Sequence, residues 1–159
     1  EGDGGDRLYV VIEGKIKRFD EKNVFWKQAI RDDLENKLSH MPMHIFFGEV
    51  YGQVQDLKYD IKSGTEFRVY DVYSISEHKY LNFEDAIRAA KICNLNWVPI
   101  LYEGPWTTKL TELAEGQSTI AKNVREGFVV RPKIERWNEK VGRVVLKQQG
   151  EGYLLRKKK

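Results

Sequence analysis

Two carboxylates and a lysine occur in stretches of this sequence that otherwise have the composition of buried strands. Glu49 lies between two glycines in FFGEVYG, Glu126 opens EGFVVRP, and Lys147 closes RVVLK. A carboxylate inside an apolar strand is costly unless a partner compensates its charge. A lysine at a strand end can neutralise a phosphate, and an opposed glutamate can hold a divalent metal ion. The structural alternatives are a water-facing edge position for Glu49 and a surface ion pair between Glu126 and Lys147, which would contribute little.

A further stretch, EFRVYDVY, places an aromatic side chain beside a carboxylate in one predicted strand. Tyr70 offers a flat ring on which a nucleotide base can stack, with a favourable free energy of roughly 1–3 kcal/mol. The alternative is a tyrosine that only packs. Asp71 needs a partner, either backbone amides or an arginine. Strict alternation predicts Phe67, Val69 and Asp71 on one face of the strand and Tyr70 on the other.

The elements that must position these residues follow from hydrophobic periodicity. Apolar residues at four- and five-residue steps predict one helix over residues 24–38. Asn82 followed by Asp85 resembles a capping box that starts a second helix, which runs to residue 92. Strands are predicted at residues 8–12, 44–51, 66–73, 97–102, 127–131, 143–147 and 153–155, with a short helix at 107–114 and a polar connection at 132–142. The order lacks a regular βαβ alternation and indicates an α+β domain with antiparallel sheets and flanking helices.

Length and composition are those of one globular domain, expected to cover residues 1–159. The formal charge is 27 − 24 = +3, a mild excess that says little about partners. The one cysteine, Cys93, ends an amphipathic stretch and is expected to be a buried structural thiol. No apolar run is long enough to cross a bilayer and no signal-peptide pattern opens the chain. We therefore expect an intracellular, cytoplasmic protein that does not contact membranes.

The start of the sequence predicts an N-terminally truncated domain. The opening EGDGGD has the composition of a tight turn and leads directly into the predicted strand 8–12. A turn of this kind joins two strands, and the first of them is missing. We therefore expect a fragment.

Four segments in order, FFGEVYG, EFRVYDVY, EGFVVRP and RVVLKQQGEGYLLRK, resemble nucleotidyltransferase motifs III, IIIa, IV and V of the covalent ligase superfamily. They are more similar to the RNA ligases than to DNA ligases or capping enzymes. The start of the first predicted helix, NVFW, and the end of the chain resemble the Deinococcus-type, nick-sealing RNA ligase branch. The likeness extends from about residue 8 to residue 157.

The resemblance implies an adenylation (nucleotidyltransferase) domain that uses ATP and Mg²⁺ or Mn²⁺. In this family a lysine attacks the α-phosphate of ATP, AMP passes to an RNA 5′-phosphate, and a 3′-hydroxyl then displaces AMP. The implied partner is RNA, in the form of a nicked duplex. Such phosphoryl-type transfer depends mostly on positioning and charge neutralisation.

The resemblance also implies roles for individual residues. Glu49 would bind the ribose hydroxyls, and Lys147 would contact the α-phosphate. Glu126 would help to place the metal ion. The aromatic residue under the adenine would be Tyr70, with Phe67 as the alternative if the register differs, and the other face of the base would be covered by Val129 or Val130.

The sequence departs from the family pattern in its nucleophile and in its basic residues. The family nucleophile lies in a Lys-x-x-Gly motif ahead of the first hairpin, and no such motif occurs there. Lys15 and Lys17 lack the following glycine, and only Lys17 or Arg18 could replace the arginine of the family's next motif. Gln149 stands where motif V often has a second lysine. We therefore expect that this chain alone does not form the lysine–AMP adduct.

Two other functions remain open at the level of sequence. The core is shared with DNA ligases and mRNA-capping nucleotidyltransferases. A non-catalytic nucleotide- or RNA-binding module would also fit a chain without the nucleophile.

Overall fold

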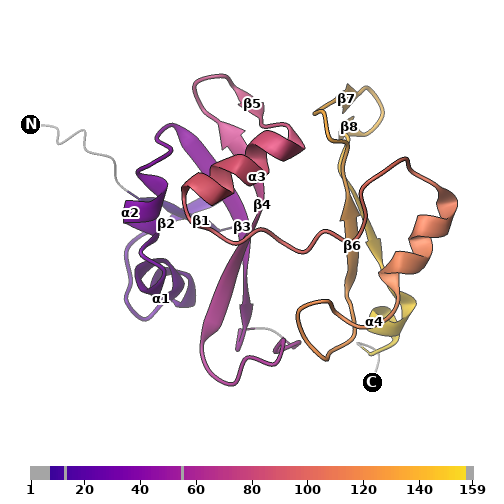
Figure 1. The fold of residues 1–159 in the computed structure, drawn as a ribbon. Helices are drawn as coiled ribbons and strands as arrows, with labels where there is room; N and C mark the ends of the chain where they lie inside the picture. The colour runs from indigo at the N-terminus through magenta and orange to yellow at the C-terminus, as the bar shows by residue number, and fades with distance from the viewer. Residues whose placement is uncertain (1–7, 13, 55, 157–159) are drawn as a thin grey trace, which may run out of the picture.

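The computed structural model describes residues 8–12, 14–54 and 56–156, in which two groups of elements lie side by side (Figure 1). The N-terminal group contains β1 (Val10–Ile12), β2 (Lys15–Lys17), α1 (Val24–Arg31), α2 (Leu34–Leu38), β3 (His44–Gly52), β4 (Thr65–Ser74), β5 (Lys79–Tyr80) and α3 (Phe83–Ile92). The C-terminal group contains the 3-10 helix η1 (Thr108–Ala114), β6 (Gly127–Val130), β7 (Trp137–Asn138), β8 (Gly142–Arg143), β9 (Leu146–Gln149) and α4 (Glu151–Arg156). The paired strands are antiparallel, which confirms the predicted α+β class. The turn predicted at residues 1–6 lies outside the described residues.

The core of the N-terminal group forms between β4 and α3. Val69 and Val72 are fully buried and pack against the alanine face of α3, formed by Ala86, Ala89 and Ala90. Small side chains on this helix face allow it to lie close to the sheet. Cys93, directly after α3, is buried as predicted, and burial raises the pKa of its thiol.

A register shift interrupts the pairing of β3 with β4. Gly48 pairs with Val69 and Phe47 pairs with Asp71, so that Tyr70 is the extra residue on β4. An extra residue of this kind is a β-bulge, which changes the face to which the following side chains point. Val69 and Val72, three residues apart, therefore enter the same core. The predicted alternation was wrong beyond Val69, because it placed Val72 on the face opposite Val69.

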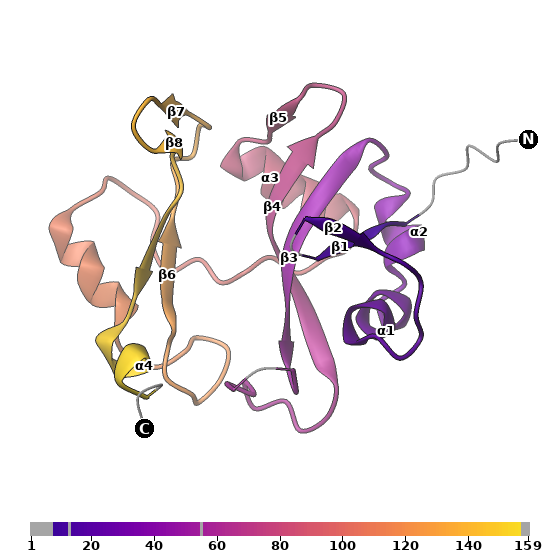
Figure 2. The ribbon, with the colours of Figure 1, turned by 180° about the vertical axis from the view of Figure 1, so that it is seen from behind.

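The C-terminal group is built on the ladder of β6 and β9, seen from both sides in Figures 1 and 2. The helices η1 and α4 lie on the side of this ladder that faces away from β3 and β4. Glu115, directly after η1, accepts hydrogen bonds from the backbone nitrogens of Glu151 and Gly152. This contact stabilises the first turn of α4. The strand predicted at residues 153–155 was wrong because this distant carboxylate caps a helix there.

The helix predicted at residues 24–38 is two helices. Asn23 accepts from the backbone nitrogens of Phe25 and Trp26 and caps α1. The break follows at Asp33, whose φ of 52° is left-handed and cannot continue a right-handed helix. Helix α3 has the predicted bounds, but Asn82 makes no side-chain cap. Its side-chain oxygen accepts instead from the backbone nitrogen of Glu135.

The strand predicted at residues 97–102 is absent from the described residues as a regular element. Trp97 forms only an isolated bridge to Val69, and the chain then crosses to the C-terminal group (Figure 1). Pro99 and Pro105 lack the N–H groups that would extend the pairing. The strand predicted at residues 143–147 is split between β8 and β9, and β7 pairs with β8 inside the predicted polar connection. No helix among the described residues is long and apolar enough to cross a membrane.

Candidate functional site

The bulge in β4 brings Glu49 and Tyr70 together on the face of the sheet opposite α3. Glu49 pairs with Arg68 just before the bulge. Tyr70 is 45% exposed, whereas Val69 and Val72 of the same strand are fully buried. Burial and the negative charge of Glu49 raise the pKa of Tyr70. The sheet therefore presents a half-exposed aromatic ring beside a carboxylate.

The β6–β9 ladder contributes a lysine and a valine. Lys147 pairs directly with Val129, and directly paired residues point to the same face of an antiparallel ladder. The Val129 side chain is 58% exposed. Val130 pairs with Leu146 and points to the other face. Of the two valines predicted to cover a base, Val129 is the one beside Lys147.

Glu126 stands at the turn into β6, next to a glycine with an unusual backbone. Gly127 has a φ of 148°, and a Cβ there would lie 2.0 Å from the carbonyl oxygen of Gln148. Only glycine tolerates this approach of β6 to β9. The backbone of Glu126 is held as well, because its carbonyl accepts from the backbone nitrogen of Gly150.

Electrostatic interactions connect these residues from both groups of elements. Burial raises the pKa of Glu49 most, the negative charge of Glu126 raises it further, and the positive charge of Lys147 lowers it. Charges shift a pKa strongly only when they are close. Glu49 therefore lies near enough to Tyr70, Glu126 and Lys147 to interact electrostatically with each of them.

Tyr59 joins this group, and the sequence did not single it out. Its hydroxyl donates a hydrogen bond of 2.9 Å to Oε1 of Glu126. Burial, the hydrogen bond to Glu126 and the charge of Glu49 raise the pKa of Tyr59. A tyrosine in a loop between two predicted strands carries no recognisable motif, so only the fold reveals this contact.

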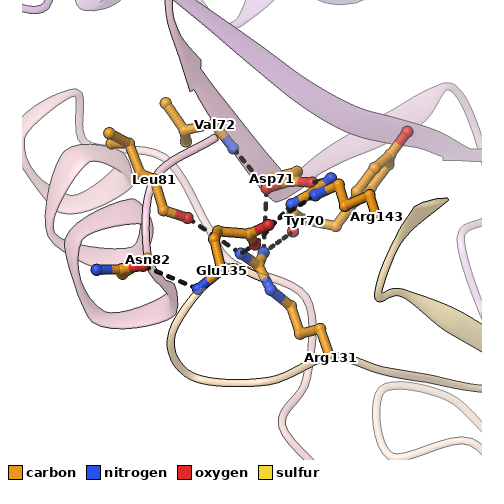
Figure 3. A network of polar contacts seen from close by, with 8 residues as sticks. All are labelled: Tyr70, Asp71, Val72, Leu81, Asn82, Arg131, Glu135 and Arg143. Atoms are coloured by element: carbon orange, nitrogen blue, oxygen red, sulfur yellow. Dashed lines mark hydrogen bonds and ion pairs between the residues drawn. The ribbon is translucent and has the colours of Figure 1, made fainter. Parts of the chain in front are cut away.

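A second polar group lies beside Tyr70 and is shown in Figure 3. Asp71 accepts hydrogen bonds from Arg131, at 3.1 Å, and from Arg143. Both arginines also bind Glu135, at 2.7 and 2.8 Å. The guanidinium of Arg143 stacks on the Tyr80 ring, 3.4 Å from its centroid. Asp71 thus has the arginine partners that the sequence left as one of two alternatives, and Val72 N supplies a backbone amide as well.

This polar group connects the two groups of elements. Arg131 donates to the carbonyl oxygen of Tyr70, the bulge residue, and to that of Leu81, which follows β5. The four charged side chains, Asp71, Arg131, Glu135 and Arg143, are 9–19% exposed. Burial opposes ionisation of Glu135, but hydrogen bonds and charges of the two arginines outweigh it and lower its pKa. We call these four residues the clamp.

The other predicted residues lie away from this face. Phe67 packs into the core, and a Cβ on Gly48 would lie 2.3 Å from its ring. Gly48 therefore allows the close approach of Phe67, and Phe67 lies on the face opposite Glu49. Lys17 is the last residue of β2, with Arg18 directly after it, in the hairpin of β1 and β2.

An RNA ligase family model matches residues 7–148, and the chain belongs to this family. No curated protein matches the sequence significantly.

Solved structures with a similar fold include several of Naegleria gruberi RNA ligase. The complex with PPi has 24% identity and a TM-score of 0.75, and the match covers 90% of this chain and 43% of that one. A lysine-to-alanine variant with ATP and Mn has 23% identity and a TM-score of 0.75, with the same coverage. An apo aspartate-to-alanine variant has 25% identity and a TM-score of 0.74, again with 90% and 43% covered. The chain thus spans less than half the length of these ligases.

Proposed function

We propose that the chain is the adenylate-binding part of an ATP-dependent RNA ligase that joins a 3′-hydroxyl to a 5′-phosphate through enzyme–AMP and RNA–adenylate intermediates. The proposal is carried by the electrostatic contact of Glu49, in β3, with Tyr70 in β4, with Glu126 directly before β6 and with Lys147 in β9. Family membership supports the reaction class. Nick sealing in duplex RNA, as in the Deinococcus-type branch, is the physiological role that we propose.

The residues present fit an adenine nucleotide. Tyr70 and Val129 are both half-exposed and can contact the two faces of a base, which gains favourable stacking energy from the aromatic ring. Glu49 can accept hydrogen bonds from ribose hydroxyls. Lys147 can neutralise the α-phosphate and stabilise charge that develops there during transfer.

The carboxylates fit a divalent cation held jointly with the nucleotide. Among the described residues no three His, Cys, Asp or Glu side chains form a metal cluster. Mg²⁺ commonly takes one or two protein carboxylates and completes its shell with water and phosphate oxygens. Glu126, beside Glu49, would hold the ion, which when bound neutralises phosphate charge.

Nucleotide binding by the chain tests the proposal. We expect AMP to bind, and Lys147→Ala to weaken binding roughly 10–100-fold, because a charge-assisted hydrogen bond to the phosphate is lost. Calorimetric titration of AMP into the full chain measures this. Lys109→Ala, in η1, removes a lysine on the far side of the ladder and is the matched control. Equal affinity of both variants for AMP would refute the role of Lys147, and no AMP binding by the unaltered chain would refute the proposed function.

We also propose that the chain does not label itself with AMP. The sequence KQQG at residues 147–150 has the Lys-x-x-Gly spacing, but it lies in β9 and its continuation. Incubation with labelled ATP and Mg²⁺ should give no AMP-protein band, and a band would contradict this. A longer chain that includes a Lys-x-x-Gly nucleophile motif distinguishes an RNA ligase from a DNA ligase. Its sealing activity is compared on nicked duplexes that carry RNA or DNA on the 3′-hydroxyl side.

A further inference from the structure

The loop between β3 and β4 has an unusual backbone at two successive residues. Tyr59 has a φ of 51° and Asp60 a φ of 61°, both in the left-handed region. Aspartate tolerates this region, whereas a bulky residue such as tyrosine rarely adopts it. Conformations of this kind persist only where the surrounding structure holds them.

Contacts across the molecule hold this loop in place. The Tyr59 hydroxyl donates to Oε1 of Glu126 at 2.9 Å, and the Asp60 carboxylate accepts from the backbone nitrogen of Lys122 at 2.8 Å. The Tyr59 ring also meets the edge of Tyr51, with centroids 5.4 Å apart. The loop that follows Glu49 is therefore attached to the segment that leads into β6.

We infer that Tyr59 is a positioning residue whose hydroxyl sets the orientation of the Glu126 carboxylate for a divalent cation. The inference rests on the proposed function, in which Glu126 holds the metal ion. The hydrogen bond occupies Oε1 and so determines the direction in which Oε2 points. Glu49 lies nearby and repels Glu126, and the hydrogen bond from Tyr59 opposes rotation of Glu126 away from it.

The Tyr59 hydroxyl is suited to this role because a phenol is a hydrogen-bond donor and Glu126 is its acceptor. Side chains that orient a metal ligand typically change metal affinity 10–100-fold when they are removed. Tyr51, against which Tyr59 packs, is itself fixed by hydrogen bonds to Glu66 and Arg68, at 2.7 and 2.9 Å.

Mn²⁺ binding by the full chain tests the inference. Free Mn²⁺ is measured by electron paramagnetic resonance during titration, once with AMP and once without it. We expect Tyr59→Phe to weaken Mn²⁺ binding about tenfold or more and to leave metal-free AMP affinity unchanged. Tyr102→Phe is the matched control, because it removes a hydroxyl that donates to a surface carbonyl, that of Pro105. Glu126→Gln should weaken Mn²⁺ binding, and Tyr59→Phe should add nothing in the Glu126→Gln background.

The outcomes separate this inference from the proposed function. Three results would overturn the role of Tyr59. Tyr59→Phe could bind Mn²⁺ as tightly as the unaltered chain, or it could weaken binding just as much in the Glu126→Gln background. The third is that the unaltered chain binds no Mn²⁺. A circular dichroism spectrum and melting temperature like those of the unaltered chain exclude a folding defect as the cause of weaker binding. If AMP does not bind but Mn²⁺ binding depends on Tyr59 and Glu126, the adenylate site fails while the role of Tyr59 stands. If AMP binds and Tyr59→Phe has no effect, only the role of Tyr59 fails.

Discussion

At the scale of single residues, the side chains that converge are of two kinds. Glu49, Tyr70, Glu126 and Lys147 are recognisable in the sequence because each stands out from an apolar strand in a motif. Tyr59 is different, because it acts on a residue far along the chain and its own neighbours give no signal. A motif can therefore indicate groups that would touch a ligand, whereas the groups that orient them become visible only in the fold.

Tyr70 allows the proposed base contact to be tested at this scale. Its ring is 45% exposed beside the Glu49 carboxylate. Tyr70→Ala should lower AMP affinity by roughly 5–150-fold, because base stacking contributes about 1–3 kcal/mol. Tyr70→Phe keeps the ring and should keep most of the affinity. Calorimetry with AMP measures both, and equal losses in the two variants would assign the effect to the hydroxyl and contradict stacking.

At the scale of elements, local patterns predicted most helices and strands but not their interruptions. The bounds of β3, β4 and α3 were predicted within about one residue, from strand composition, from alternation and from a capping-box pattern respectively. The bulge at Tyr70 was missed because it arises from pairing with β3, and the predicted alternation therefore put Val69 and Val72 on opposite faces although both enter one core. Helix α4 was taken for a strand because the Glu115 carboxylate that caps it lies far away in the sequence.

Gly127 provides a test of the β6–β9 element. A Cβ at this position would lie 2.0 Å from a backbone oxygen of β9, whereas Gly116, also with positive φ, has nothing within 4 Å. Gly116→Ala should therefore cost only the backbone strain, about 1 kcal/mol. Gly127→Ala should cost clearly more and should also weaken AMP binding, since it separates Glu126 from Lys147. Urea unfolding of both variants gives the comparison, and similar losses would mean that the close approach is not required.

At the scale of the whole molecule, the clamp connects the sheet that carries Tyr70 to the chain segments after β6 and at β8. The sequence left backbone amides and an arginine as alternative partners for Asp71. It could not identify the arginines, because they come from segments that meet only when both groups of elements have folded. Figure 3 shows that Arg131 and Arg143 each contact both Asp71 and Glu135. Removing one member leaves the others buried with incomplete compensation. The clamp should therefore contribute to the stability of the entire chain.

The contribution of Glu135 to this stability should depend on pH. Burial opposes its ionisation, but Arg143 and Arg131 lower its pKa below the ordinary value of 4.5. A carboxyl whose pKa is lower in the folded state stabilises the protein fully above about pH 4.5, and this stabilisation is lost as the pH falls through the folded-state value. Glu135→Gln should cost about 3 kcal/mol of unfolding free energy at pH 7, and the difference from the unaltered chain should shrink below pH 4.5. Glu84→Gln, which alters an exposed ion pair with Lys133, should change stability by less than about 1 kcal/mol. Thermal unfolding of both variants is measured from pH 7 to pH 3. If the cost of Glu135→Gln does not change with pH, the charge of Glu135 does not hold the two groups of elements together.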